Sequence, residues 1–230
     1  MDHIQELRRY LPAIRVVRSA YEYIMEGSRR ICELHERPLE LYFYLLTERP
    51  TPYGMALGTG AYLPRGQKLS RNSCALTLEG KVSAINGIAQ QGKYILGWAH
   101  SHGEMPAFHS GTDDRNTLSR VMQSGLETRI GRRLGREKQK EIASSREDGA
   151  THLVEYDERA CEVVSLRKVR YACSLVVSPH RGEHYGVIAV QDEEGLHLLK
   201  DVEIEIVGDE KDIGVDERRL DEELEGIMAE

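Results

Sequence analysis

The 230-residue chain has 40% hydrophobic and 30% charged residues and a formal net charge of −7, values that are ordinary for one globular domain. No apolar run approaches the roughly 18–20 residues that a membrane-spanning helix needs, and the first residues lack the basic and apolar segments of a secretory signal. We therefore expect a cytoplasmic protein without a membrane partner. Its cysteines are scattered with no CxxC pair, which argues against a thiolate zinc site or a disulfide framework.

The first half of the chain alternates between strand and helix signals. Residues 13–20 form a β-branched run that predicts a strand, and the spacing of apolar residues in 21–37 predicts a helix that ends before Pro38. Residues 39–48 are rich in aromatic and aliphatic side chains, which is typical of a buried strand. Glycine and proline then separate further predicted strands at residues 54–63, 73–79 and 94–102.

The second half returns to strands after one more helix. Residues 113–127 predict a helix, with Ser110 or Thr112 available as its N-cap and Gly125 near its end. Later strands are expected at 151–156, 170–178, 184–191 and 195–207, and a short acidic helix at 215–230. The sum is a mixed α/β domain over residues 1–208, with a central β-sheet flanked by helices, an exposed insertion at about 126–168 and an acidic C-terminal tail at 209–230.

The segment GWAHSH, residues 97–102, ends one predicted strand with His100 and His102. Side chains at i and i+2 of a strand project from the same face, so these imidazoles lie about 6–7 Å apart along the strand and can converge on one ion. A buried pair of this kind without a metal would need separate partners for its ring nitrogens. Catalytic zinc sites commonly use three protein ligands plus water. The pattern therefore predicts a metal site whose third ligand comes from elsewhere.

Asp113 lies just inside the following helix and can return to the end of the strand as that third ligand. Asp114 and His109 are alternatives, because both lie in the same short segment. Ser110 lies between them, where its hydroxyl could face an oxygen held at the metal.

The pattern H-x-H, seven residues, S, two residues, D resembles the active-site signature of the JAMM (MPN-plus) metalloproteases. Its positions here are His100, His102, Ser110 and Asp113. The segment RPLELYFYLL also resembles the part of that family in which a catalytic glutamate opens a strand after the first helix, which points to Glu40. The similarity covers roughly residues 13–124, although Gly103 and His109 stand where family members usually have proline.

The resemblance implies an MPN fold with a cytidine-deaminase-like architecture and one zinc ion per chain, bound by His100, His102 and Asp113. It implies that Glu40 acts as acid and base, a role for which Glu36 or Glu48 would otherwise be equal candidates, and that Ser110 assists an oxyanion. The expected reaction is hydrolysis of a peptide or isopeptide bond, at the C-terminus of a ubiquitin-like or sulfur-carrier protein. A homodimer and a complex subunit are both left open.

Other functions remain alternatives. A zinc deaminase shares the broad architecture, but its P-C-x-x-C element is missing here. A non-catalytic interaction module of the MPN fold would normally have lost the ligands that this chain keeps. Relatives in DNA repair also carry a similar motif, so the motif alone does not name the substrate.

A basic stretch follows the motif helix, and it consists of Arg129, Arg132, Arg133, Arg136, Lys138 and Lys140. Such a stretch is most often a solvated surface, and nucleic-acid binders usually carry a wider basic stripe, so nucleic acid is not expected as a partner. The alternative hypothesis is that it contacts a protein substrate near the metal site.

Overall fold

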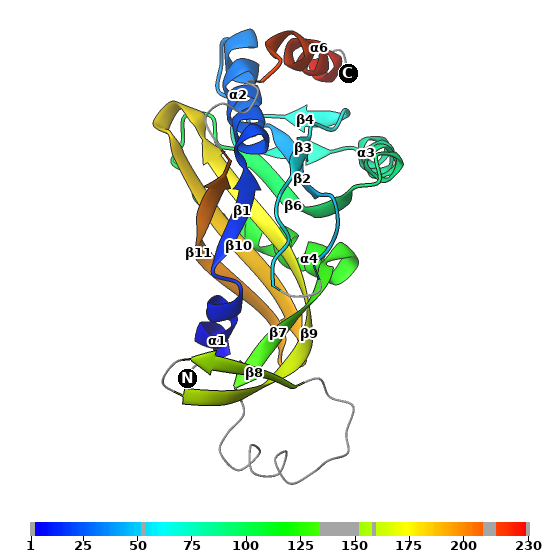
Figure 1. Ribbon diagram of the computed structural model, residues 1–230. Helices are drawn as coiled ribbons and strands as arrows, with labels where there is room; N and C mark the ends of the chain where they lie inside the picture. Colours follow the sequence, from blue (N-terminus) through cyan, green and yellow to red (C-terminus); the bar gives the residue numbers. More distant parts are fainter. Residues whose placement is uncertain (1–2, 52–53, 134–151, 158–159, 209–214, 229–230) are drawn as a thin grey trace.

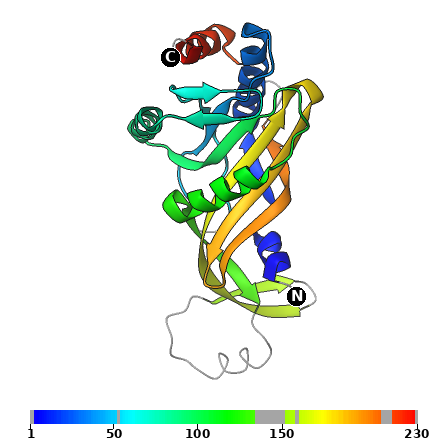
Figure 2. The same cartoon turned by 180° about the vertical axis from the view of Figure 1, so that it is seen from behind.

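A large mixed β-sheet runs through the molecule, and helices lie against it on both faces (Figures 1 and 2). The computed structural model describes residues 3–51, 54–133, 152–157, 160–208 and 215–228, and for those between 131 and 166 it describes the backbone alone. The mixed α/β class with a central mixed sheet flanked by helices is thereby confirmed. No helix within these ranges is long and apolar enough to cross a membrane.

The long strand β9 (Ala160–Ser178) is the spine of the sheet. The strand order is β1-β11-β10-β9-β6-β2-β3, and both β7 and β8 pair with the first half of β9. β6 is parallel to β9 and β1 to β11, while the other pairs are antiparallel. The bounds are β1 Ala13–Val17, β2 Tyr42–Thr47, β3 Gly60–Tyr62, β6 Tyr94–Ser101, β7 Leu126–Arg133, β8 His152–Asp157, β10 Glu183–Asp192 and β11 Gly195–Val207. The short strands β4 (Gln67–Leu69) and β5 (Cys74–Leu76) form a separate pair.

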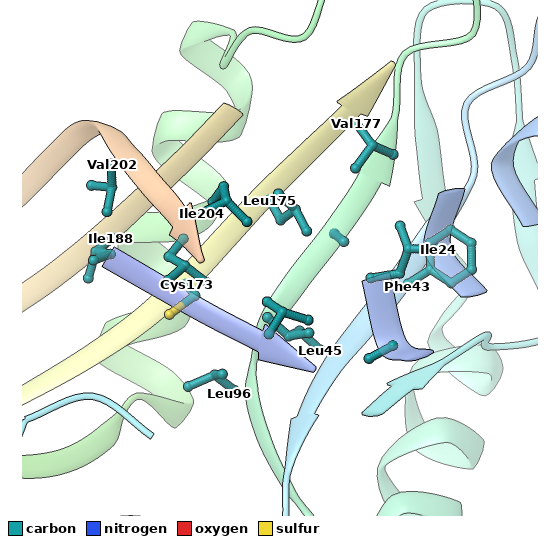
Figure 3. Packing of buried hydrophobic residues seen from close by; sticks show 14 of the residues in the cluster. Ile24, Phe43, Leu45, Leu96, Cys173, Leu175, Val177, Ile188, Val202 and Ile204 are labelled. Carbon is teal, nitrogen blue, oxygen red and sulfur yellow. The ribbon is translucent and has the colours of Figure 1, made fainter. Parts of the chain in front are cut away.

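Alternation along the strands gives the sheet two apolar faces. On β2, Phe43 and Leu45 point into the main core, which includes side chains of α1 (His3–Tyr10), α2 (Arg18–Leu34) and α6 (Glu217–Met228) (Figure 3). Tyr42 and Tyr44 point to the opposite face, where they pack with Trp98 and with α3 (Leu78–Gln90). The helix α4 (Gly111–Ser124) covers the same opposite face over β9 and β10. The sheet therefore presents the odd and even positions of its strands to different helices.

Most predicted elements are present, with shifted ends. The strand expected at 13–20 ends at Val17, after which α2 begins, and all six side chains of β2 are buried as expected. The prediction of elements failed in two places. Residues 78–79, which were expected to end a strand, begin the helix α3, and no helix was predicted where α1 lies. Cys32, Cys74 and Cys173 are free thiols, as expected, and the side chain of Cys161 lies outside the description.

The segment 126–168 is not simply an exposed insertion. Its first part is β7, which pairs along β9 and buries alternate side chains at Leu126, Thr128 and Ile130. β8 and the start of β9 continue the same sheet. The prediction was wrong for residues 126–133 because polar residues at every second position of a half-buried strand resemble an exposed loop. Residues 134–151 lie outside the described part.

The acidic tail carries the predicted helix, now placed as α6, and this helix packs on α2 (Figure 1). Its apolar side belongs to the main core, with Leu220 and Leu224 fully buried. Arg30 of α2 donates to both carboxylate oxygens of Asp221, at 2.6 and 2.5 Å. The tail helix is therefore part of the folded domain.

Candidate metal centre

The register of β2 and β6 brings Glu40 and the two histidines together. Tyr42 of β2 pairs with His100 of β6 in antiparallel register, so Glu40, two residues before Tyr42, lies opposite His102. Two hydrogen bonds between Ser101 and Leu41 hold these strand ends together. The Ser101 backbone N–H donates to the Leu41 carbonyl, and the Leu41 N–H donates to Ser101 Oγ, both at 2.9 Å. The sheet therefore fixes the acid and the imidazoles on adjacent strand ends.

Asp113 reaches the same point through the first turn of α4. Ser110 is the N-cap of that helix, and it forms a reciprocal capping box with Asp113. Val121, which lies later in the same helix, packs against Ala172 and Ala189 of the sheet. Of the two N-caps that the sequence allowed, Ser110 is the one used, and the capping box directs the Asp113 carboxylate toward the strand ends.

The ligand atoms of His100, His102 and Asp113 all lie within 4.8 Å of one another. The two histidine Nε2 atoms are 3.2 Å apart, and His100 Nε2 is 3.7 Å from Asp113 Oδ2. Two ligands held about 2.0–2.1 Å from one zinc ion at a tetrahedral angle are separated by about 3.3 Å. These three side chains therefore fit a small divalent cation in both donor type and spacing.

The protonation of the histidines also suits a metal. The His102 Nδ1 atom lies 2.8 Å from the Pro106 carbonyl oxygen, to which it donates, so the lone pair of a neutral ring is on Nε2. Burial lowers the pKa of His100, and the neighbouring His102 and His109 lower it further against the opposing effect of Asp113. Burial thus favours the neutral form of His100, and the Pro106 carbonyl leaves His102 Nε2 facing the same centre.

Glu40 is buried beside this centre but is not within the group of three ligands. Its side chain is 6% exposed, and Oε1 lies 4.0 Å from His102 Nε2. Burial, and secondarily the negative charge of Asp113, raise the pKa of Glu40 to about 8. A carboxyl group that exchanges a proton near neutral pH is suited to acid–base work.

Ser110 takes a position different from the one expected of an oxyanion donor. Its hydroxyl donates to Asp113 Oδ2 at 2.7 Å and accepts from the Asp113 backbone N–H at 3.2 Å. In this arrangement Ser110 orients a candidate ligand. Its assistance to an oxyanion stays a prediction, because the hydroxyl proton would have to turn away from Asp113.

His109 and Asp114 are neighbours of the centre rather than ligands. The His109 side chain is 1% exposed, and its ring nitrogens contact Asp114 Oδ1 at 2.7 Å and Ser174 Oγ at 2.9 Å. Asp114 also accepts from Lys200 Nζ at 2.5 Å. The two link α4 to the sheet, with the His109 side chain buried and Asp114 partly exposed. No sequence spacing indicated the contribution of Ser174.

Aromatic residues line the floor and the rim of the centre. Trp98 is buried beneath His100, as expected of a core residue, and Thr117 of α4 accepts its indole N–H. Phe108 lies edge-on to His102, with ring centroids 4.7 Å apart, yet 44% of it remains exposed. An added Cβ at Gly103 would lie 2.7 Å from Pro38 Cβ. The loop therefore packs tightly on one side and offers an apolar edge on the other.

The basic stretch lies away from the centre where the structure describes it. Arg129 pairs with Lys168, whereas His100 lies beside Val176, eight residues further along β9. At ~3.3 Å per residue this is a separation of about 26 Å. Arg129, Arg132 and Arg133 thus lie on a strand that leads away from the metal centre, and their contact with a protein substrate stays a hypothesis. Arg136, Lys138 and Lys140 lie outside the described residues.

No protein-family model matches this chain, and no curated protein matches it. Its structure is similar to the solution structure of protein DSY2949 from Desulfitobacterium hafniense, with a TM-score of 0.47 and 14% sequence identity. That similarity covers 86% of this chain and 95% of the other.

Proposed function

We propose that this protein is a zinc-dependent metalloprotease of the JAMM type, with an MPN fold. One observation carries the proposal: the ligand atoms of His100, His102 and Asp113 lie within 4.8 Å of one another, and the buried carboxyl group of Glu40 lies beside them. Two neutral imidazoles and one carboxylate are the donor set of many catalytic zinc sites, which keep a further position open.

His100, His102 and Asp113 would hold the metal, and their summed charge of −1 leaves a bound Zn²⁺ site net positive. A zinc ion in such a site polarises a carbonyl and lowers the pKa of water toward 7. The Ser110 hydroxyl and the Pro106 carbonyl keep Asp113 and His102 in the orientation that binding requires.

Glu40 would perform the proton transfers of amide hydrolysis. Its carboxylate takes a proton from the attacking water and then delivers it to the leaving amine, so that one group serves as base and as acid. The raised pKa of Glu40 supports this role, although a nearby cation favours the ionised form and lowers that pKa. General acid–base catalysis of this kind typically contributes about 10²–10⁴-fold to the rate.

The proposed substrate is the C-terminal tail of a ubiquitin-like or sulfur-carrier protein, joined through a peptide or isopeptide bond. The resemblance to JAMM proteases suggests this class of substrate. The half-exposed ring of Phe108 beside His102 gives the tail an apolar surface to pack against as it approaches the centre.

The experiment is cleavage of a panel of ubiquitin-like and sulfur-carrier proteins, each carrying a C-terminal peptide fusion or a lysine isopeptide. The zinc-loaded protein should cleave at least one of them. Glu40→Gln should retain zinc and lose about 10²–10⁴-fold in rate, because an amide cannot accept the proton. Glu104→Gln is the matched control, since Glu104 is an exposed carboxylate near the site that pairs with Arg71.

Three results separate the alternatives. Cleavage that survives in Glu40→Gln would remove Glu40 from the reaction. Loss of zinc in that variant would make Glu40 a ligand. Zinc-loaded protein that binds a fusion tightly but cleaves none would indicate a non-catalytic interaction module instead of a protease.

A further inference from the structure

A second cluster of histidine and carboxylate groups lies at the other end of the sheet. It joins His3 of α1 to Asp192 and His197 of the β10–β11 hairpin, and the ligand atoms of these three residues lie within 4.8 Å of one another. Tyr185 of β10 pairs with Val176, which lies beside His100, so Asp192 is seven residues further along β10. The two clusters are therefore about 23 Å apart along the sheet.

The distances in this cluster are those of ligands around one small ion. His3 Nε2 lies 3.0 Å from Asp192 Oδ2, and His197 Nε2 lies 3.2 Å from Asp192 Oδ1. These separations are close to the ~3.3 Å expected between two tetrahedral zinc ligands. The Asp192 side chain is fully buried, while the His3 and His197 side chains are 16% and 17% exposed. The two partly exposed rings thus lie nearer the solvent than the carboxylate does.

Both ring nitrogens of His3 face carboxylate oxygens. His3 Nδ1 lies 3.1 Å from Glu194 Oε2, while its Nε2 faces Asp192. A neutral imidazole has only one N–H, so without a further group one ring nitrogen would direct its lone pair at a carboxylate oxygen. A cation between Nε2 and Asp192 removes this conflict, because Nδ1–H then donates to Glu194. Histidine ligands of metals almost always donate their other N–H in this way.

Donors from neighbouring residues orient the Asp192 carboxylate. The Glu194 backbone N–H donates to Asp192 Oδ1 at 2.9 Å. Arg167 Nη1 lies 3.3 Å from Asp192 Oδ2, the oxygen that also faces His3 Nε2, while His197 Nε2 faces Oδ1. These contacts fix the orientation of the two carboxylate oxygens toward the imidazoles.

We propose that His3, Asp192 and His197 form a second, structural metal site that binds Zn²⁺ or a similar borderline transition-metal ion. Two imidazoles with one carboxylate favour zinc, cobalt, nickel or copper over calcium and magnesium, which prefer all-oxygen sites. The bound ion would pin α1 to the β10–β11 hairpin, because His3 is the first residue of α1 and the other two ligands flank the hairpin turn. The site does not depend on the proposed protease activity.

The test is zinc stoichiometry by elemental analysis and zinc titration by calorimetry at pH 8, on the full chain. The wild type should bind two zinc ions. His3→Ala/His197→Ala and His100→Ala/His102→Ala should each bind one, and the combined variant none. Glu194→Ala should keep the ligands but weaken the second site by about 10–100-fold. His180→Ala, at an exposed histidine, is the control and should bind two.

Two outcomes overturn the proposal. A wild type that binds one zinc ion, lost in His100→Ala/His102→Ala and kept in His3→Ala/His197→Ala, would show that the second cluster is held by protonated histidines alone. Equal stoichiometry in wild type and His3→Ala/His197→Ala with a folded circular dichroism spectrum would do the same. If instead the first centre binds no zinc, the protein would lose zinc only in the variants of His3 and His197.

Discussion

The indole ring of Trp98 lies flat against the imidazole of His100, with ring centroids 4.7 Å apart and planes 14° from parallel. This contact fixes the plane of a candidate ligand, and the indole N–H binds Thr117 Oγ1 at 3.1 Å. Trp98→Ala should destabilise the protein by about 3–5 kcal/mol. It should also weaken zinc binding, since the imidazole of His100 loses the indole ring against which it packs. Trp98→Phe keeps an aromatic floor and should cost less. Urea unfolding and zinc titration measure both effects, and unaltered zinc affinity in folded Trp98→Ala would contradict this role.

Asp113 and Asp114 are adjacent in sequence and give a direct test of the ligand assignment. Asp113→Asn should strongly weaken zinc binding at the first centre, because an amide oxygen carries no charge to offset the ion. Asp114→Asn should keep zinc, since that carboxylate contacts His109 and Lys200 instead. Elemental analysis after dialysis against a weak chelator measures the difference. The reverse result would make Asp114 the third ligand.

His109 should behave as a structural residue. His109→Ala leaves the buried Ser174 hydroxyl without this partner and breaks the link to Asp114, which we expect to cost about 1–3 kcal/mol. The zinc content should stay at the wild-type level. Denaturant unfolding measures the cost, and a loss of one zinc ion with little loss of stability would instead identify His109 as a ligand.

The pH dependence of the metal-free protein should report on Glu40. Its pKa is raised from 4.5 to about 8 in the folded state, so the protonated form favours folding. This contribution is complete below pH 4.5 and is lost as the pH rises through about 8. Chelator-treated wild type should therefore lose stability between pH 5 and 9 relative to Glu40→Gln, and zinc should reduce the difference. Parallel stability curves for the two proteins would mean that Glu40 is ionised throughout.

Reversing the charge of Arg129 should leave catalysis unchanged. Arg129 is exposed on β7 about 26 Å from the level of His100, which is beyond the ~8 Å Debye length at physiological salt. Arg129→Glu should thus keep the Michaelis constant for any protein substrate that the panel identifies. A several-fold rise that disappears at high salt would show that the substrate extends along β7.

The first centre could be anticipated because its information is local. His100 and His102 share a strand face, Ser110 and Asp113 share a helix cap, and each relation spans only a few residues. Glu40 was predicted only through the resemblance to the JAMM proteases. The β2–β6 register, which sets Glu40 opposite His102, explains why it lies beside the centre. The second cluster could not be found this way, because His3 and Asp192 are 189 positions apart and meet only through the folded sheet.

The helix α3 was missed for a different reason. Its buried positions are Gly80, Ala84 and Ile88, whereas the larger Leu78, Val82 and Ile85 are exposed. Two of the three buried positions, Gly80 and Ala84, are thus small, and most of the bulky apolar residues point outward. Hydrophobic periodicity indicates a helix when the large residues face the core, so the usual signal was inverted here.

The β2–β6 register changes at a bulge between Leu45 and Leu46. Pairing on the site side of this bulge runs from Tyr42 with His100 to Leu45 with Gly97, and the far side is offset by one residue. Chain-length changes between the two strands, in residues 48–93, can therefore be absorbed without turning Glu40 away from His102. Deleting one residue of 42–45, by contrast, would turn Glu40 to the other face of the sheet, away from His100 and His102.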